Sequence, residues 1–303
     1  MSRIRIWVEY WLRAIGAFHV TKRLIQRFET VGLRVLTSWK QLTHGGSWPP
    51  QRQGNLVMFH TARSGSSVTA GLLSQHPEIY WGGELFNYNL PLWRSKPRDR
   101  LTEARSFIKP RINYVDIPFY GFEVLPTQLR AGQIETDVFI TVLEDFGIEN
   151  FVLLTRRNIL RKIVSTLVAR ERKRWHLKSG EIAPLTQIYI DTANLELESI
   201  KPLLEHIRDV QAEYETLQAL LSSRRYLHLV YEDDVLRDPR RGYRKICRFL
   251  GIQCVELPVR HERTTPQPLS QIIQNYADLE YVLSGTEFEW MLEEGVVSPT
   301  NLA

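Results

Sequence analysis

The sequence contains very little cysteine and no long hydrophobic run. Its two cysteines, Cys247 and Cys254, have no further ligand-type partners nearby, so neither a disulfide framework nor a zinc site is supported. A reducing compartment, the cytoplasm, is therefore predicted. No stretch reaches the roughly 18 consecutive apolar residues of a membrane-spanning helix, and no apolar stretch precedes a small-residue cleavage site. Neither a membrane anchor nor a signal peptide is supported.

A strong charge of one sign is also missing. The net charge is +5 over 303 residues, with a pI near 9.2. This balance suits an anionic ligand or surface but is too mild to predict nucleic-acid binding. Hydrophobic residues make up 43% of the chain, which is enough to bury the core of a globular protein.

The basic surplus is concentrated in residues 1–42, which hold eight Lys/Arg against two Glu. Apolar residues recur there at helical spacing, which predicts a basic, amphipathic helical extension. Two interpretations stay open: the helices pack on the domain or on the second subunit of a homodimer, or they bind peripherally to an anionic membrane. Residues 43–54 are rich in Gly and Pro and predict a linker, and residues 55–303 form the main domain.

Beyond the linker, strand-like and helix-like segments alternate. Apolar runs predict strands at 55–62, 120–125, 150–155 and 226–233, and helical periodicity predicts helices at 66–75, 137–146, 158–178, 190–221 and 239–250. Such alternation is typical of a three-layer α/β fold with a parallel sheet, here of the P-loop nucleotide-binding type.

The motif "TARSGSSV" follows the first predicted strand and precedes a helix. An ATP-binding loop would carry lysine after its last glycine, but Gly65 is followed by Ser66 and Ser67. Gly65 permits a tight turn, and the amides and hydroxyls of Ser64, Ser66 and Ser67 suit a phosphate or sulfate at a helix N-terminus. Arg63 adds a fixed positive charge. The motif predicts an anion site without the ATP–magnesium apparatus.

Two further motifs follow in order along the chain. In "NFVLLTRRNILRKIVSTLVAR", Arg157 lies at the end of a buried strand and Ser165 two helical turns beyond it. This spacing allows both side chains to converge on one phosphate. "YEDDVLRDPRRGYRKICRFLGI" begins at Tyr231, after the last predicted strand.

Together the three motifs resemble those of sulfotransferases that use 3′-phosphoadenosine-5′-phosphosulfate (PAPS). The resemblance covers roughly residues 54–292. "GGELF", "ARERKRWH" and "LSQIIQNYADLEYVLSGT" make it nearest in appearance to bacterial carbohydrate and lipid enzymes of the trehalose and nodulation-factor types.

The resemblance implies a cofactor, a reaction and residue roles. PAPS would donate its sulfuryl group in line to a hydroxyl or amine of a carbohydrate, glycolipid or small polar metabolite, leaving 3′-phosphoadenosine-5′-phosphate (PAP), with no metal. Arg63 with Gly65, Ser66 and Ser67 would neutralise the transferring group. The 3′-phosphate would be held by Arg157 and Ser165. The adenine would contact Tyr231. The R-K-G loop of the steroid and phenol enzymes is absent, which leaves Arg263 in "HERTTPQP" as the predicted third phosphate contact.

The acceptor requires a general base. The resemblance assigns this role to Glu84 in "WGGELF", and Glu123 in "YGFEVLP" is the competing assignment. For the acceptor platform we expect Phe86, Trp175 and His176.

Two other functions remain as alternatives. A kinase or NTPase of the same fold would show a magnesium requirement. A non-catalytic, membrane-associated nucleotide-binding protein would bind PAP without turning over any acceptor.

Overall fold

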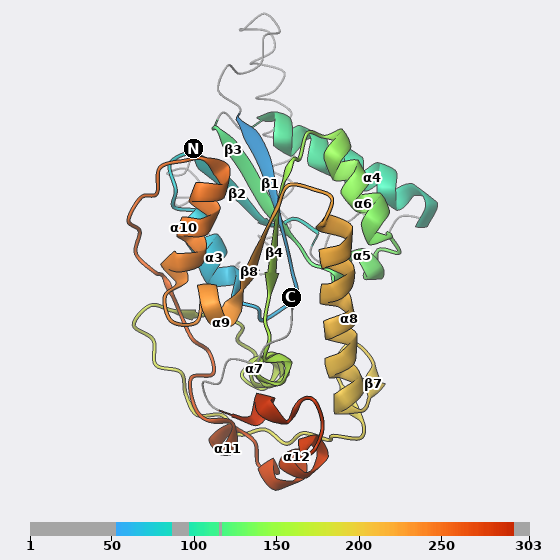
Figure 1. Cartoon of the computed structure of the whole chain (residues 1–303), viewed down its shortest axis with the longest axis vertical. Coiled ribbons are helices and arrows are strands. Elements are labelled where there is room, and N and C mark those ends of the chain that lie inside the picture. Colours follow the sequence, from blue (N-terminus) through green and yellow to red (C-terminus); the bar gives the residue numbers. More distant parts are fainter. Residues whose placement is uncertain (1–52, 87–96, 115–116, 294–303) are drawn as a thin grey trace, which may run out of the picture. The chain divides into compact units, whose positions relative to one another are not determined.

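The computed structural model describes residues 53–86, 97–114 and 117–293 (Figure 1). The chain divides into two compact units, one of residues 1–52 with 102–116 and one of residues 53–101 with 117–303. Helix α4 (Pro97–Tyr114) crosses their boundary. The helical extension expected over residues 1–42 lies outside the described residues. The fold and site described below belong to the second unit.

A five-stranded sheet runs through this unit. Its strands are β1 (Gly54–His60), β2 (Ile79–Glu84), β3 (Phe119–Val124), β4 (Asn150–Thr155) and β8 (Tyr226–Val230). They lie in the order β2-β3-β1-β4-β8, and every neighbouring pair is parallel. Strands β1, β3 and β4 are almost completely buried, as expected of parallel strands covered on both faces.

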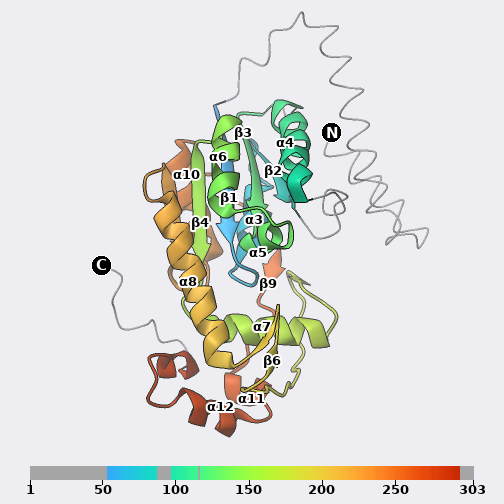
Figure 2. The same ribbon diagram turned by 90° about the vertical axis from the view of Figure 1, so that its right-hand side faces the viewer.

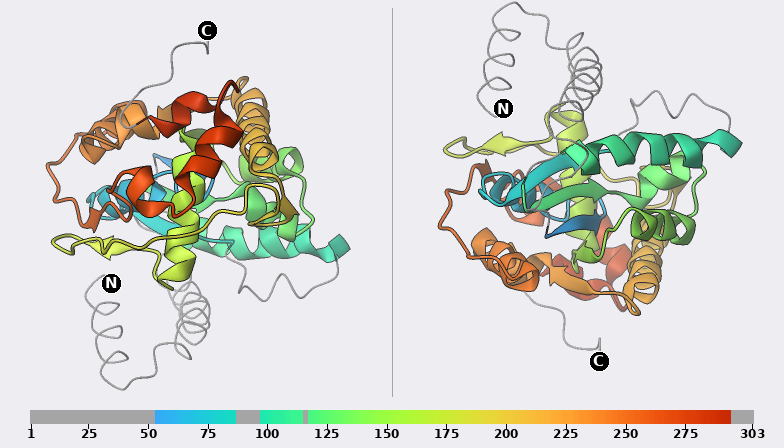
Figure 3. Two further views of the ribbon diagram at one scale, coloured as in Figure 1. Left: turned by 90° about the horizontal axis from the view of Figure 1, so that it is seen from below. Right: turned by 90° about the horizontal axis from the view of Figure 1, so that it is seen from above.

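Helices cover both faces of the sheet. On one face lie α3 (Ser66–Leu73) and α10 (Pro239–Leu250), and on the other lie α5 (Pro126–Ala131), α6 (Thr136–Asp145) and α8 (Leu203–Leu221) (Figures 1 and 2). The end-on views in Figure 3 show the sheet between these two groups. The predicted three-layer α/β fold of the P-loop type is confirmed.

The remaining elements lie beyond the carboxyl ends of the strands. Helix α7 follows β4 and packs with α8 and the chain's last elements around a second hydrophobic core (Figure 2). The elements beyond the sheet are the helices α7 (Ile159–Glu171), α9 (Tyr231–Asp234), α11 (Leu269–Ile272) and α12 (Tyr276–Leu283) and the 3₁₀ turn Glu289–Leu292. The short strands β5 (Leu177–Lys178), β6 (Leu195–Glu196), β7 (Ile200–Lys201) and β9 (His261–Glu262) lie there as well.

Helix ends follow the local sequence closely. The side chain of Asp238 accepts a hydrogen bond from the Arg240 amide, and Pro239 occupies the first turn of α10. Gly251 ends the same helix in the left-handed conformation, at φ 75°. The predicted bounds 239–250 are therefore confirmed.

Two predicted helices are too long. The helix expected over 158–178 ends at Glu171, and Lys173 then takes a positive φ of 52°. The helix expected over 190–221 begins only at Leu203, and a β6–β7 hairpin occupies the stretch before it. Pro202 precedes the helix, and proline disfavours a helical conformation in the residue before it. The last predicted strand also ends early, because Tyr231 begins α9.

Strand order places the functional edge of the sheet. The first strand, β1, lies in the middle; α3, which follows it, covers one face, and α8, which comes between β4 and β8 in the chain, covers the other (Figure 1). Ligands of doubly wound sheets bind where the direction of winding changes, beyond the carboxyl ends of the strands. None of the helices within the described ranges combines the length and apolar character needed to cross a membrane.

Candidate active site

The turn between β1 and α3 has an unusual backbone. Arg63 has φ 65° and Gly65 has φ 90°, so two residues of one short turn lie in the left-handed region. A Cβ atom on Gly65 would lie 2.6 Å from the ring of Tyr231, which leaves no room for a larger residue. The turn thus directs the amides of Gly65, Ser66 and Ser67 out of the start of α3, as an anion-binding turn requires.

A buried polar network supports the underside of this turn. The Ser64 hydroxyl donates to the Thr61 carbonyl at 2.9 Å, and the Thr61 hydroxyl lies 2.7 Å from that of Tyr214. The amide of Arg156 donates to Tyr214 Oη at 3.3 Å. Burial raises the pKa of Tyr214, outweighing the hydrogen bonds from its neighbours. Ser64 is fully buried in this network, so its hydroxyl points away from the pocket above the turn.

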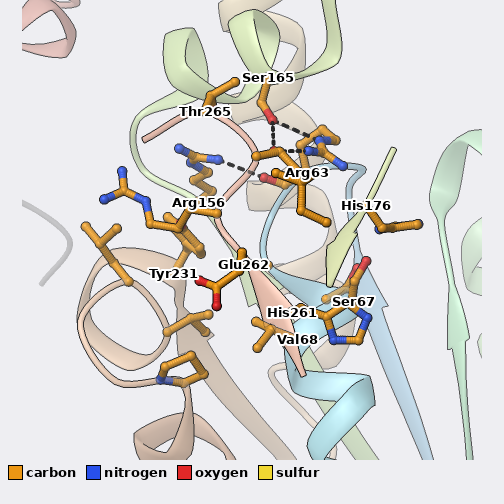
Figure 4. A pocket seen from close by; sticks show the side chains of 18 of the residues that line it. Arg63, Ser67, Val68, Arg156, Ser165, His176, Tyr231, His261, Glu262 and Thr265 are labelled. Carbon is orange, nitrogen blue, oxygen red and sulfur yellow. Dashed lines mark hydrogen bonds between the residues drawn. The ribbon is translucent and has the colours of Figure 1, made fainter. Parts of the chain in front are cut away.

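A pocket opens above the turn (Figure 4). Among the residues predicted for the site, the pocket brings together Arg63, Gly65, Ser66, Ser67, Ser165, Trp175, His176, Tyr231 and Arg263. Ser64, Glu84, Phe86, Glu123 and Arg157 do not line it.

Arg63 extends across this pocket. Its guanidinium donates to the Ser165 hydroxyl at 2.9 Å and to the Trp175 carbonyl at 2.7 Å, and it also contacts the Thr264 hydroxyl. All three acceptors are neutral, and Arg63 has no carboxylate partner in the described part of the chain. Burial, together with the charge of Arg156, lowers the pKa of Arg63 to about 10. The positive charge of Arg63 is therefore poorly compensated, whereas Arg156 has the Glu232 carboxylate at 4.0 Å.

Arg156 is the second cation at the pocket. Its guanidinium donates to the Arg63 carbonyl at 3.0 Å and lies over the Tyr231 ring at 4.3 Å (Figure 4). The side chain of Arg157, which was predicted to hold a phosphate, instead pairs with Asp233. Both positions follow β4 directly, and the sequence alone did not show which of the two arginines faces the pocket.

The segment beginning at Tyr231 joins the other two motifs. Glu232 accepts hydrogen bonds from the amides of Arg157 and Asn158 at 3.0 and 3.1 Å, which fixes the turn after β4. The Tyr231 ring packs against Gly65 from the other side. The three motifs quoted above therefore meet at one edge of the sheet.

The far wall of the pocket comes from a short antiparallel pair. Strands β5 and β9 align Lys178 with His261, and the ring of His176 lies 6.3 Å from that of His261. This pairing brings the exposed Trp175 and His176 next to Arg263, which is itself exposed. These residues are nearly 90 positions apart in the sequence, and their pairing had no local signal.

Carboxylates gather on the other side of β1. Glu84 ends β2 and pairs in register with Glu123, the last residue but one of the neighbouring strand β3. His60 ends β1, and its Nε2 lies 3.0 Å from Glu123 Oε2. One ring nitrogen of His60 and one carboxylate oxygen each of Glu84 and Glu123 all lie within 4.8 Å of one another. The two residues that competed for the role of base are therefore neighbours.

Two known proteins can be compared with this arrangement. The chain is 27% identical over 246 residues to nodulation protein H of Rhizobium meliloti (strain 1021), which covers 78% of this chain and 93% of that protein. A second nodulation protein H from Rhizobium meliloti is 26% identical over the same length. The chain is thus similar to nodulation protein H over most of its length. The resemblance to the nodulation-factor type is thereby confirmed, although no protein-family model matches the chain.

One predicted site residue needs correction. Phe86 is completely buried and packs edge-on against Phe139, with ring centroids 5.1 Å apart. Its ring belongs to the hydrophobic core, so it cannot serve as a platform for the acceptor.

A second pocket, of about 500 Å³, adjoins the same turn from the opposite side. It shares Thr61 and Ala62 with the turn, and its walls come from α5, α7, α8 and the β6–β7 hairpin. Ion pairs line it, among them Arg130 with Glu198. Burial lowers the pKa of Lys162, another wall residue, to about 8. No local sequence signal indicates this pocket, because its walls come from segments far apart in the chain.

Proposed function

We propose that this protein is a sulfotransferase that uses PAPS as its donor. The observation that carries the proposal is the pair Arg63 and Arg156 at the start of α3, where Arg63 has only neutral hydrogen-bond partners. An incoming anion of high charge would complete the electrostatics of such a site. The relationship to nodulation protein H supports the same conclusion.

The donor would lie across the carboxyl ends of β1 and β4. Its 5′-phosphosulfate would accept hydrogen bonds from the amides of Gly65, Ser66 and Ser67 and from Arg63, which would neutralise charge as the bridging S–O bond breaks. Arg156 would support these contacts through the Arg63 carbonyl. The proposal requires no step that uses a metal.

The 3′-phosphate would lie nearer to α7. There we retain Arg157 and Ser165, with Arg263 at the rim of the pocket. The guanidinium of Arg157 would exchange its present partner Asp233 for the phosphate. The adenine would pack by Tyr231, beside the Arg156 guanidinium.

The acceptor would be deprotonated by Glu84. This carboxylate is exposed, whereas Glu123 is only 5% exposed and makes contacts with His60 and Trp81. Glu84 is held by Gln128, whose amide donates to Glu84 Oε2 at 3.1 Å. A base must reach the acceptor, so the exposed carboxylate is the better assignment.

We place the acceptor in the second pocket. One wall includes Thr61 and Ala62, which lead into the turn after β1, and another is formed by Pro126, Thr127 and Arg130 of α5. Gln128 of the same helix holds Glu84 just outside this lining, and the acceptor hydroxyl would extend from the pocket to that carboxylate. Alternating hydroxyl and charged side chains on its walls suit a polyhydroxylated acceptor such as a carbohydrate or glycolipid headgroup. Sulfation of a panel of sugars and glycolipids with labelled PAPS tests this, and Lys162→Met should raise the KM for the acceptor while leaving PAP binding unchanged.

Thermal stabilisation by PAP tests the donor class first. Ligand at 100 times its Kd should stabilise the protein by about 2.7 kcal/mol. AMP, which lacks the 3′-phosphate, and ATP with magnesium are the controls. Stabilisation by PAP that exceeds stabilisation by either control is the expected result. A larger effect of ATP with magnesium would replace the proposal with a kinase or NTPase.

A further inference from the structure

His60 is a buried histidine with acceptors at both ring nitrogens. It is 1% exposed and ends β1 directly before the anion-binding turn. Its Nδ1 lies 3.1 Å from the Thr61 carbonyl, which can only accept a hydrogen bond. Its Nε2 lies 3.0 Å from Glu123 Oε2, a close ionic contact that is not well aligned as a hydrogen bond. A neutral imidazole has one N–H, so it cannot donate at both positions.

Two arrangements of protons satisfy these contacts. Either the imidazole carries both protons and Glu123 is ionised, or the Glu123 carboxyl carries the second proton. The indole of Trp81 donates to Glu123 Oε1 at 3.0 Å, and a donated hydrogen bond favours the ionised carboxylate. The nearby Glu84 carboxylate favours a positive charge on the ring. Both neighbours thus support the imidazolium.

The balance of these effects is a raised pKa for His60. Burial alone would lower the pKa, but the contact with Glu123, the Thr61 carbonyl and the charge of Glu84 together outweigh it. These groups, from β3, from the turn after β1 and from β2, are the ones that act on the ring within the described residues.

We propose that His60 is a positioning residue, a buried imidazolium that balances the paired carboxylates Glu123 and Glu84 and so keeps Glu84 ionised and ready to accept a proton. Without this cation, two carboxylates in register on neighbouring strands would repel each other, and their protons would be lost only at higher pH. Glu84 would then be ionised over a narrower pH range than in the wild type.

The role of His60 during transfer follows from this charge balance. The acceptor oxygen forms a bond to sulfur, the bridging S–O bond of the donor breaks, and the acceptor's proton moves to Glu84. His60 keeps both of its protons throughout. The catalytic part of this inference rests on the proposed function, but the protonation of His60 and Glu84 is a property of the free protein.

Nuclear magnetic resonance of the free protein tests the charge state directly. Protein with ¹³C-labelled histidine and glutamate is titrated in the presence of EDTA, and the His60 and Glu84 signals are assigned from His60→Gln and Glu84→Gln. We expect His60 to remain doubly protonated at pH 7. A neutral His60 ring at that pH overturns the proposal without any variant.

Charge-balanced variants test the effect on Glu84. In His60→Gln the titration midpoint of Glu84 should rise by about one pH unit, because Glu123 then acts on it without compensation. In the double variant His60→Gln/Glu123→Gln the midpoint should return towards the wild-type value, because both charges are removed. His228→Gln is the matched control. This histidine lies on β8 and is hydrogen-bonded to Thr155, so its loss should leave the titration midpoint of Glu84 unchanged.

These outcomes separate the inference from the proposed function. An unchanged Glu84 midpoint in folded His60→Gln, or no return in the double variant, overturns the inference even if PAP binds. Where His60→Gln does not fold, the double variant and the wild-type titration still decide the matter. The inference would survive a failure of PAP binding, which would remove only the proposed reaction.

Discussion

Strand β1 separates a basic side of the sheet edge from an acidic one. Towards β4 and β8, Arg63 and Arg156 converge on the anion-binding turn, and Arg63 lacks a carboxylate partner within the described residues. Towards β3 and β2, Glu123 and Glu84 lie together, and His60 supplies a cation between them. The two sides differ in how their charge is balanced.

This difference indicates what each side requires from a ligand. The basic side is left incomplete and gains its balancing charge when an anion binds. The acidic side carries a cation of its own in His60, which compensates part of the charge of Glu123 and Glu84. A highly charged donor and a neutral acceptor would fit these two sides respectively.

The largest expected effect is on the acidic side. Glu84→Gln should lower turnover by about 10²–10⁴-fold, because the acceptor would lose its base. PAP should still stabilise the variant as it does the wild type, since Glu84 does not line the donor pocket. Unchanged turnover in Glu84→Gln would contradict this assignment and would mean that the base lies elsewhere. Glu289→Gln, an exposed carboxylate in the 3₁₀ turn, serves as control.

The turn on the basic side can be tested through its backbone. Gly65→Ala should cost about 1–2 kcal/mol from the left-handed conformation alone, and more from the contact with the Tyr231 ring. Gly251→Ala, at φ 75° with no neighbour within 4 Å, isolates the conformational part. Chemical denaturation of both variants gives the difference. Equal losses would mean that crowding by Tyr231 is unimportant.

The two adjacent arginines should differ in ligand preference. Arg156→Ala should weaken PAP and AMP alike, by about 10-fold or more, because Arg156 supports the turn that holds the 5′ group. Arg157→Ala should weaken PAP but leave AMP nearly unchanged, because its predicted partner is the 3′-phosphate. Calorimetric titration of both ligands measures the four affinities. Equal loss of PAP and AMP in Arg157→Ala would remove Arg157 from the 3′-phosphate site.

The pair His60–Glu123 should also give a pH-dependent stability. Because the folded-state pKa of His60 is raised, its contribution is fully present below the unfolded value near 6.5 and is lost as pH rises through the folded value. The Tm of the wild type should therefore fall more than that of His60→Gln/Glu123→Gln as pH rises above 6.5. Parallel curves for the two proteins would contradict a charged His60.

The smallest effect is expected beneath the turn. Tyr214→Phe removes hydrogen bonds to Thr61, Ser64 and the Arg156 amide, and should lower the free energy of unfolding by about 1 kcal/mol. Thr216→Val, an exposed position on the same helix, is its control. A larger loss of PAP affinity than of stability would show that the network also sets the shape of the turn.

Local sequence signals predicted the elements that have clear boundaries. Residues 150–155 and 239–250 form β4 and α10 as predicted, because an uninterrupted apolar run marks the strand and Pro239 and Gly251 bound the helix. The helix predicted for the stretch before Leu203 was wrong, because the apolar spacing there fits both a helix and a hairpin. Pro202 decides in favour of the hairpin.

The site was predictable where one motif supplies the residues, as in the turn from Arg63 to Ser67. Contacts between strands were not predictable. The alignment of Glu84 with Glu123 depends on the register of β2 and β3, which passes through an irregularity after Trp81. Likewise, which of Arg156 and Arg157 faces the pocket depends on how the chain leaves β4, and this is set by Glu232, far away in the sequence.

The central place of β1 also affects how this chain folds. Leu56 pairs with Gly121 on one side and with Asn150 on the other, so both neighbours of the first strand are made much later. During synthesis one edge of this apolar strand stays unpaired until β4 has emerged. Parallel pairing across such long stretches folds slowly and exposes the chain to aggregation. We expect the nascent chain to depend on chaperones until residue 155 has left the ribosome.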